Sequence, residues 1–254
     1  MLKEIKNLFS FLTTIPVAMD KDMLTDVAKG MFLFPLMGAF IGLLAGLMGW
    51  VTSLFLPSLI VGALVLGFLL LITGLHHTDG LLDFGDGVMA HGSPERKIEI
   101  MHDQLTGAGG LSLGIITFLV TAFAIAELDP GHIIQGMVVA EVSAKIAMVI
   151  AMVIGAWAGK SLHQGMSSCF LEAMHGKKGA ARLIVALAIS FGIAIPLLSF
   201  AGAIVVLVAI LASLVMVEIA HKHFKGVTGD VLGATNELTR MVSLITLVAV
   251  VGWA

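Results

Sequence analysis

Long apolar runs alternate with polar segments along the 254 residues of the chain. A helix needs about 20 mostly apolar residues to cross a hydrocarbon core that is about 30 Å thick. Runs close to this length predict seven transmembrane helices, at 31–55, 58–75, 109–127, 132–158, 183–199, 201–220 and 238–254. We therefore expect an all-α bundle that forms a single polytopic membrane domain over residues 1–254.

The connections between these runs differ in length and in charge. Tight turns are predicted at Pro57, at Pro130 and at 198–202, and none of the 14 Lys and Arg residues lies in them. Lys and Arg gather instead at or near the face that carries the longer connections, at 76–108, 159–182 and 221–237. Positive charge marks the cytoplasmic side of a membrane protein. We expect these connections and the amino terminus to be cytoplasmic, at the cell membrane, and the carboxyl terminus to emerge outside.

The first 30 residues follow a different pattern. Apolar residues recur at helical spacing, with charged and polar residues between them, at Leu2, Ile5, Leu8, Phe9 and Leu12. This pattern is typical of a helix that lies in the membrane interface. No small-residue cleavage site follows a continuous apolar core, so the segment does not resemble a signal peptide. We expect 1–30 to be an interfacial segment.

Composition agrees with a membrane protein. The chain is 58% hydrophobic and 12% charged, whereas an ordinary soluble domain has roughly 25% charged residues. Glycines spaced four apart at Gly38, Gly42 and Gly46 permit close helix contacts, within one chain or between chains of a homo-oligomer. The net charge of −3 gives no indication of a nucleic-acid partner.

Three carboxylates follow directly on the second apolar run. Asp79, Asp83 and Asp86 lie at i, i+4 and i+7, so a helix places them on one face. They repel one another and cost free energy next to a membrane unless they bind a cation or face water. Mg²⁺ or Mn²⁺ bound to such oxygens typically bridges protein carboxylates to substrate phosphates. The cluster therefore predicts a metal site for phosphate chemistry.

A second acidic stripe follows a short turn. Glu95, Glu99 and Asp103 share one face of the next predicted helix, and an antiparallel pair would bring the two stripes together around a metal centre. The alternative is a solvated face on which Glu95 and Glu99 pair with Arg96 or Lys97. Both interpretations remain open for Glu99, whereas a solvated position is favoured for Glu95.

Four segments carry a family resemblance. The chain reads H-T-D-G-L-L-D-F-G-D-G at 77–87, E-R-K-I-E-I-M-H-D-Q-L-T-G at 95–107, G-V-T-G-D-V-L-G-A-T-N-E at 226–237 and F-L-T-T-I-P-V at 11–17. These segments resemble the motifs of cobalamin synthase, the adenosylcobinamide-GDP ribazoletransferase family. Asp83 to Ala90 also resembles the start of the CDP-alcohol phosphotransferase motif, but His91 stands where that family has Arg.

The resemblance implies a Mg²⁺-dependent phosphotransferase that acts on a pyrophosphate. A hydroxyl of α-ribazole or its 5′-phosphate attacks the corrinoid-attached phosphorus of adenosylcobinamide-GDP, and GMP leaves. The product is adenosylcobalamin or its 5′-phosphate. The family also implies a bilayer setting, in which association with other nucleotide-loop assembly enzymes is one expectation.

Site roles follow from the spacing and from the resemblance. Spacing and chemistry assign Asp79, Asp83 and Asp86 to the metal, and Asp103 or Glu99 to the general base. The matching motifs add five substrate-binding candidates, which are His77, Arg96, Asp230, Asn236 and Glu237. The alternative for the last motif is a turn before the final helix.

A transporter or channel is the competing class of function. Asp79, Glu141, Lys145 and Glu218 could line an ion path, since ionisable groups within a membrane often do. Glu141 and Lys145 lie four apart, however, and are expected to pair. A transporter built from repeats would be expected to carry a second copy of the acidic block. The back half of this chain contains none.

Overall fold

The computed structural model describes residues 2–16, 23–158 and 166–251, and every element in these ranges is a helix. The all-α prediction is therefore confirmed for the part of the chain that the structure describes. The elements are α1 (Leu2–Leu12), α2 (Met23–Gly30), the short 3-10 helix η1 (Met31–Leu33), α3 (Phe34–Ser53), α4 (Ser58–Ile72), α5 (His76–Met89), α6 (Pro94–Met101), α7 (Ala108–Ala126), α8 (Ile133–Ala158), α9 (Met166–Ala173), α10 (Gly176–Phe224) and α11 (Gly229–Val251).

Four helical stretches are long and apolar enough to cross a membrane, at Met23–Ser53, Ala108–Ala126, Ile133–Gly155 and Gly176–Phe224. A fifth results if α4 and α5, which meet at an angle of 97°, are counted as one broken span. The chain is thus a multi-pass membrane protein, but length and composition do not reproduce the predicted seven spans. One reason is that α4 has 15 residues and is too short to qualify alone.

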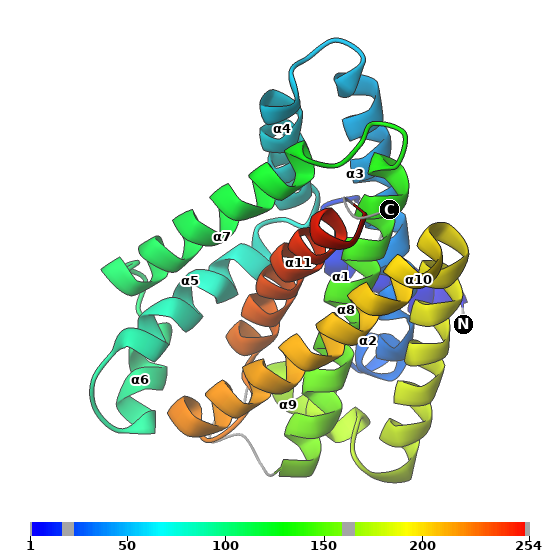
Figure 1. Ribbon diagram of the computed structural model, residues 1–254. Coiled ribbons are helices and arrows are strands. Elements are labelled where there is room, and N and C mark those ends of the chain that lie inside the picture. Colours follow the sequence, from blue (N-terminus) through cyan, green and yellow to red (C-terminus); the bar gives the residue numbers. More distant parts are fainter. Residues whose placement is uncertain (1, 17–22, 159–165, 252–254) are drawn as a thin grey trace.

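The two predicted spans 183–199 and 201–220 correspond to the two helical arms of α10, which has 49 residues and is kinked between the arms. Leu198 and Ser199 have non-helical backbone angles inside it, and the chain changes direction there. Figure 1 shows the two arms of α10, yellow and orange, diverging from this point. The turn predicted at 198–202 is therefore present as a break within a helix. Of the predicted span 238–254, residues 252–254 lie outside the described residues.

Helix α8 occupies the middle of the bundle and is the most buried of the candidate spans. It packs against α3, α10 and α11. The contact with α3 is close because a β-carbon on Gly38 would lie 2.5 Å from the carbonyl oxygen of Glu141, and one on Gly46 would lie 2.6 Å from Cα of Ile134. The glycine spacing thus serves a helix contact within the chain, one of the two uses that the sequence allowed.

The amino-terminal segment folds against the end of α4. Helix α1 is present as predicted, and the residues that follow it bring the backbone N–H of Thr14 to the carbonyl oxygen of Ile72, at 2.7 Å. This bond satisfies a carbonyl that the end of α4 would otherwise leave free. The part of the predicted interfacial segment at 17–22 lies outside the described residues.

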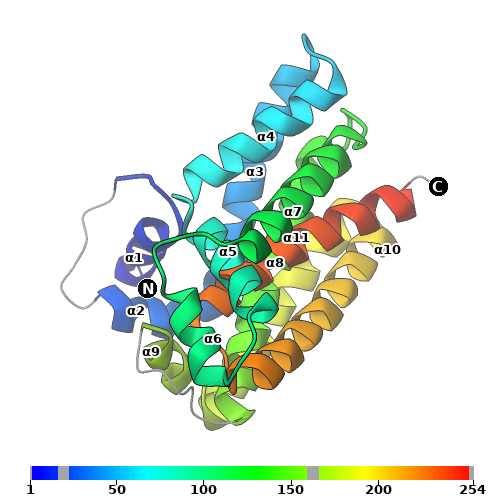
Figure 2. The same ribbon diagram turned by 90° about the vertical axis from the view of Figure 1, so that its left-hand side faces the viewer.

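In Figures 1 and 2 the α3–α4 and α7–α8 turns lie toward the top, whereas α6, α9 and the α10–α11 connection lie toward the bottom. The break in α10 lies at about mid-height in Figure 1. Of the predicted connection 159–182, residues 159–165 lie outside the described residues. Two of the three predicted turns are thus placed away from the longer connections that the structure describes.

Replacement of Gly42 by Ala should destabilise the bundle. The added β-carbon would lie 2.5 Å from the carbonyl oxygen of Met137 and 2.7 Å from Cα of Val138, so α3 and α8 would have to separate. Overpacking of this kind typically costs about 1–3 kcal/mol. Thermal unfolding in detergent measures the loss. Gly67→Ala is the matched control, because nothing lies within 4 Å of its β-carbon position, and equal effects of the two changes would contradict the packing argument.

Candidate functional site

The site begins where the chain turns from α4 into α5. Gly74 and Leu75 have positive φ angles of 65° and 61°, and this backbone produces the 97° bend. Such angles cost little at glycine but are rare for leucine. The bend directs the acidic face of α5 away from the apolar run of α4. We treat α4 as a membrane segment and α5 as lying outside it.

Helix α5 then crosses the start of α11 at very short distance. A β-carbon on Gly80 would lie 2.9 Å from Cα of Asp230, and one on Gly233 would lie 3.1 Å from the carbonyl oxygen of His77. A larger residue at either glycine would force the helices apart. Because the backbones touch here, Asp230 reaches the same region as Asp79 and Asp83.

These carboxylates affect one another's titration. Burial and the nearby carboxylates Asp79, Asp230 and Asp86 raise the pKa of Asp83 to about 7. Burial also raises the pKa of Asp230, and the charge of Asp79 adds to this effect, whereas His102 opposes it. The site thus concentrates carboxylates and their negative charge. Carboxylate oxygens are the ligands that a hard divalent cation prefers.

Asp86 has a defined structural contact. One of its carboxylate oxygens accepts a hydrogen bond from the N–H of Gly107 at 2.6 Å, and the other accepts one from the N–H of Gly110 at 2.8 Å. These donors belong to the first turn of α7, whose free N–H groups favour a negative charge. Asp86 therefore joins α5 to α7, a role that the sequence did not indicate.

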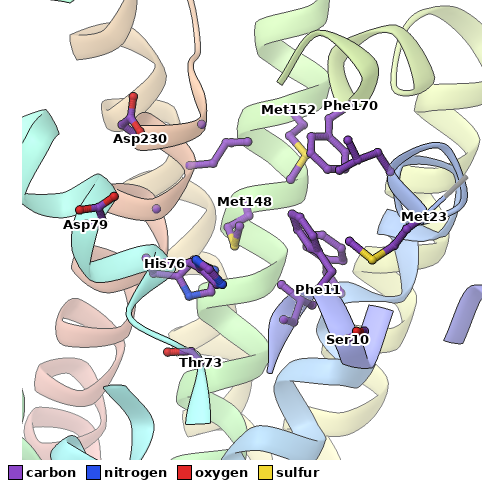
Figure 3. A pocket seen from close by; sticks show the side chains of 17 residues that line it. Ser10, Phe11, Met23, Thr73, His76, Asp79, Met148, Met152, Phe170 and Asp230 are labelled. Carbon is purple, nitrogen blue, oxygen red and sulfur yellow. The ribbon is translucent and has the colours of Figure 1, made fainter. Parts of the chain in front are cut away.

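A cavity of about 410 Å³ opens beside the acidic cluster. Asp79, Asp230 and His76 lie along one side of it, and Figure 3 shows methionine and phenylalanine side chains from α1, α2, α8 and α9 on the other. The labelled apolar residues in this view are Phe11, Met23, Met148, Met152 and Phe170. The sequence indicated no binding role for them, because methionine and phenylalanine at helical spacing are typical of any core.

His77 lines the same cavity and is buried. Its Nδ1 atom has no hydrogen-bond partner among the described residues. Burial and the cations Lys145 and Arg240 hold the pKa of His77 well below its usual value, so the ring is neutral. A buried ring nitrogen without a partner costs free energy, and a bound ligand could satisfy it.

The predicted residues of α6 and of the segment after it do not line the cavity. Arg96 and Glu99 form an exposed ion pair at 2.9 Å, which agrees with the alternative of a solvated face. Asp103 is exposed just beyond α6, where its Oδ1 accepts a hydrogen bond from the N–H of Leu105. The carboxylate that accompanies Asp79 and Asp83 is thus Asp230 of α11 rather than a residue of the second acidic stripe.

Asn236 and Glu237 belong to a buried polar network between α8 and α11. Arg240 donates to Glu141 and to Glu237, and Nζ of Lys145 donates to Oδ1 of Asn236 at 2.6 Å. Nζ of Lys145 also lies 3.6 Å from Glu141, which confirms the pair expected from the sequence. Neither Asn236 nor Glu237 lines the cavity. Two charged residues four apart inside a predicted span were the signal for such a network, but they did not identify Arg240 as its centre.

The acidic cluster is not a preformed metal cage. Among the residues with described positions, no three His, Cys, Asp or Glu side chains are grouped so as to hold one ion. Mg²⁺ usually takes only one or two protein carboxylates and completes its shell with water and substrate phosphates. The residue types at Asp79, Asp83 and Asp230 fit this mode of binding.

These features define a class, a multi-pass helical membrane protein with a cluster of carboxylates beside a partly apolar cavity. Comparison of sequences makes this class specific. The chain belongs to the cobalamin-5-phosphate synthase family, whose model matches residues 4–248.

Individual relatives agree over their full lengths. The adenosylcobinamide-GDP ribazoletransferase of Methanococcoides burtonii is 33% identical over 97% of this chain and 92% of its own. The protein of the same name from Thermococcus kodakarensis is 32% identical over 98% of this chain and 99% of its own. The one from Clostridium novyi is 29% identical, over 99% and 98%. No solved structure matches the chain.

Replacement of Arg240 by Met should strongly destabilise the protein, because it removes the ion-pair partner of buried Glu237 and leaves buried Glu141 with Lys145 alone. Loss of one partner from a buried pair costs about 3–5 kcal/mol. Arg96→Met provides the comparison, since its side chain and that of Glu99 are 63% and 66% exposed, and such pairs contribute about 0–1 kcal/mol. Unfolding in detergent compares the two, and similar losses would refute the proposed importance of the network.

Proposed function

We propose that the chain is an adenosylcobinamide-GDP ribazoletransferase, an enzyme of cobalamin biosynthesis. A hydroxyl oxygen of α-ribazole, or of its 5′-phosphate, forms a bond to the corrinoid-attached phosphorus of adenosylcobinamide-GDP. The bond from this phosphorus to the GMP oxygen breaks, GMP leaves with the electron pair, and the hydroxyl proton passes to a carboxylate. Membership of the family supports this activity. The observation that carries it is the proximity of Asp83 to Asp79 and Asp230, the last two of which line the cavity.

The proposed cofactor is Mg²⁺, with Mn²⁺ as an alternative. One or two of the carboxylates of Asp79, Asp83 and Asp230 would hold it, together with water and substrate phosphates. Asp86, which the spacing also assigns to the metal, accepts hydrogen bonds from the N–H groups of Gly107 and Gly110. Bound there, the ion neutralises charge on the phosphoryl oxygens and on the leaving group. The pKa of Asp83 is raised by burial and further by the charges of Asp79, Asp230 and Asp86, and the charge contribution supports this assignment because a cation would relieve it.

Asp103 is the better of the two candidates for the general base. Glu99 forms an ion pair with Arg96 on an exposed face. Asp103 follows His102, which is near enough to Asp230 to lower the pKa of that carboxyl. Asp103 is therefore adjacent in sequence to a residue that acts on the acidic cluster, whereas Glu99 already has a cation as its partner. Arg96 is proposed to contact the phosphates of the donor, which a guanidinium can bind in bidentate fashion.

We further propose seven crossings and a cytoplasmic active site. The crossings are α3, α4, α7, α8, the two arms of α10, and α11. The placement of two of the three predicted turns away from the longer connections that the structure describes supports this arrangement. The excess of Lys and Arg near the longer connections supports a cytoplasmic location for the end that carries α5 and α6. Association with a second copy or with other enzymes of nucleotide-loop assembly is part of the same proposal.

Purified protein should release GMP from adenosylcobinamide-GDP only when α-ribazole and Mg²⁺ are both present. Asp83→Asn keeps the shape of the side chain but removes a charge, and should slow release by about 10²-fold or more, as losses of electrostatic stabilisation do. Asp129→Asn is the control, because Asp129 lies in the exposed α7–α8 turn. Release at the normal rate by Asp83→Asn, or in excess chelator, would exclude the proposed metal chemistry.

Cysteines introduced at Gly92 and at Asp129 should react with an impermeant reagent from opposite sides of sealed vesicles. The native Cys169 is exposed and must first be replaced by Ser. Gly92 follows α5, whereas Asp129 lies in the turn between α7 and α8. Gly92 should react from the cytoplasmic side. Reaction of both positions from one side would overturn the proposed crossings.

A further inference from the structure

The cavity beside the acidic cluster has two chemically different ends. Asp79 and Asp230 lie at one end, and the side chains of Met148, Met152 and Phe170 lie at the other (Figure 3). Its volume of about 410 Å³ falls within the range of about 300–1,000 Å³ that is common for small-molecule sites. An occupant of matching chemistry has a flat or flexible apolar body and a polar group that reaches the carboxylates.

We propose that this cavity binds the planar aromatic base of the acceptor nucleoside, with the ribose directed toward Asp79 and Asp230. The proposal rests on the proposed function and deepens it, because it assigns the two substrates to different places. The donor carries a corrin ring and a nucleotide and is far too large for this volume. The acceptor is a fused aromatic base on a single sugar, which leaves the donor to approach from outside the acidic end.

The lining suits an aromatic ring. The rings of Phe11 and Phe170 come from α1 and α9, and their centroids lie 5.6 Å apart at an angle of 52°. Aromatic rings prefer edge-to-face or offset contacts with centroid distances of this size. The aromatic base of a ligand can therefore pack against these two phenylalanine rings in the same way. Met148 and Met152, on α8, add polarisable sulfur atoms, which make favourable contacts with ring edges and adapt to the shape of a ligand.

His77 supplies a polar contact. Its Nδ1 atom is buried and has no partner among the residues with described positions, and the residue lines the cavity. A benzimidazole base has one ring nitrogen that is not bonded to the sugar and can accept a hydrogen bond. A neutral imidazole that donates to this nitrogen would satisfy both groups and fix the direction in which the base enters.

Binding of the base in this cavity would position the nucleophile relative to the acidic cluster. A base held among the methionines and phenylalanines places its ribose hydroxyls near Asp79 and Asp230. The nucleophile would then be close to the carboxylates that are proposed to bind the metal, with little freedom to rotate. Such positioning is a large part of catalysis in phosphoryl transfer.

Kinetics with acceptors of different size test the proposal. Met152→Ala removes apolar contact and enlarges the cavity. It should raise KM for α-ribazole by about 10-fold or more, because the loss of even one methylene contact in an apolar pocket usually has an effect of this size. KM for adenosylcobinamide-GDP should change by less than about twofold. The same variant should use a riboside with a bulkier, three-ring base better than the wild type does. A gain of this kind cannot result from misfolding.

Met137→Ala is the matched control. Met137 is also buried on α8 but lies in a different part of the core and does not line the cavity. It should lower stability without changing either KM.

The outcomes separate the two levels of the proposal. If the wild type releases no GMP from its donor, the proposed function fails. If the wild type is active but Met152→Ala raises KM for the donor, or changes neither KM, the cavity does not bind the acceptor base. Dependence of Met152→Ala on added lipid, with both KM values unchanged, would instead identify a lipid chain as the occupant and overturn the proposal.

Discussion

The buried ion network between α8 and α11 is the interaction on which the site depends. Arg240 lies at its centre, fully buried, and binds carboxylates from both helices. Charges in such a place are tolerated only if every member is paired, so the network permits one rotation and one translation of α11 relative to α8. Asp230 lies ten residues before Arg240 on the same helix, a rise of about 15 Å. The network thus fixes where Asp230 stands, although it does not touch the site.

Glycine contacts convert this fixed register into an acidic cluster. Gly80 and Gly233 allow α5 to touch α11, and Gly85 and Gly110 allow it to touch the start of α7. Two contacts of this closeness hold α5 along its length, and Asp86 adds hydrogen bonds at the second. These backbone contacts thus hold the helices that carry the carboxylates close together. Burial and the nearby carboxylates then raise the pKa of Asp83 to about 7.

Much of this could be predicted from the sequence, for reasons that differ between residues. The helices follow from local hydrophobicity, and the structure has them in the part of the chain that it describes. The acidic face of α5 follows from helical periodicity. The proximity of Asp230 to this acidic face could not be predicted from periodicity. Asp230 lies 151 positions after Asp79 and 147 after Asp83, and only the glycine contacts between the helices bring them together.

Other features could not be predicted, because the same residue types occur both in binding sites and in structural networks. Asn236 and Glu237 stand in a motif that resembles a ligand-binding segment, yet both are buried in the network around Arg240. The cavity escaped prediction entirely, since its walls come from separate helices of the chain.

The position of the cavity indicates why a helical membrane bundle suits these two substrates. The acceptor combines an apolar base with a polar sugar, and the donor carries its charge on a pyrophosphate. A site at the end of a helical bundle can offer apolar helix surface to the first and a hydrated acidic edge to the second. In this chain α8 supplies Met148 and Met152 to the apolar surface, and the ion network joins α8 to α11, so these two methionines and Asp230 are positioned by the same interaction. The distance between base and nucleophile would then be a property of the buried charges rather than of the flexible connections around the site.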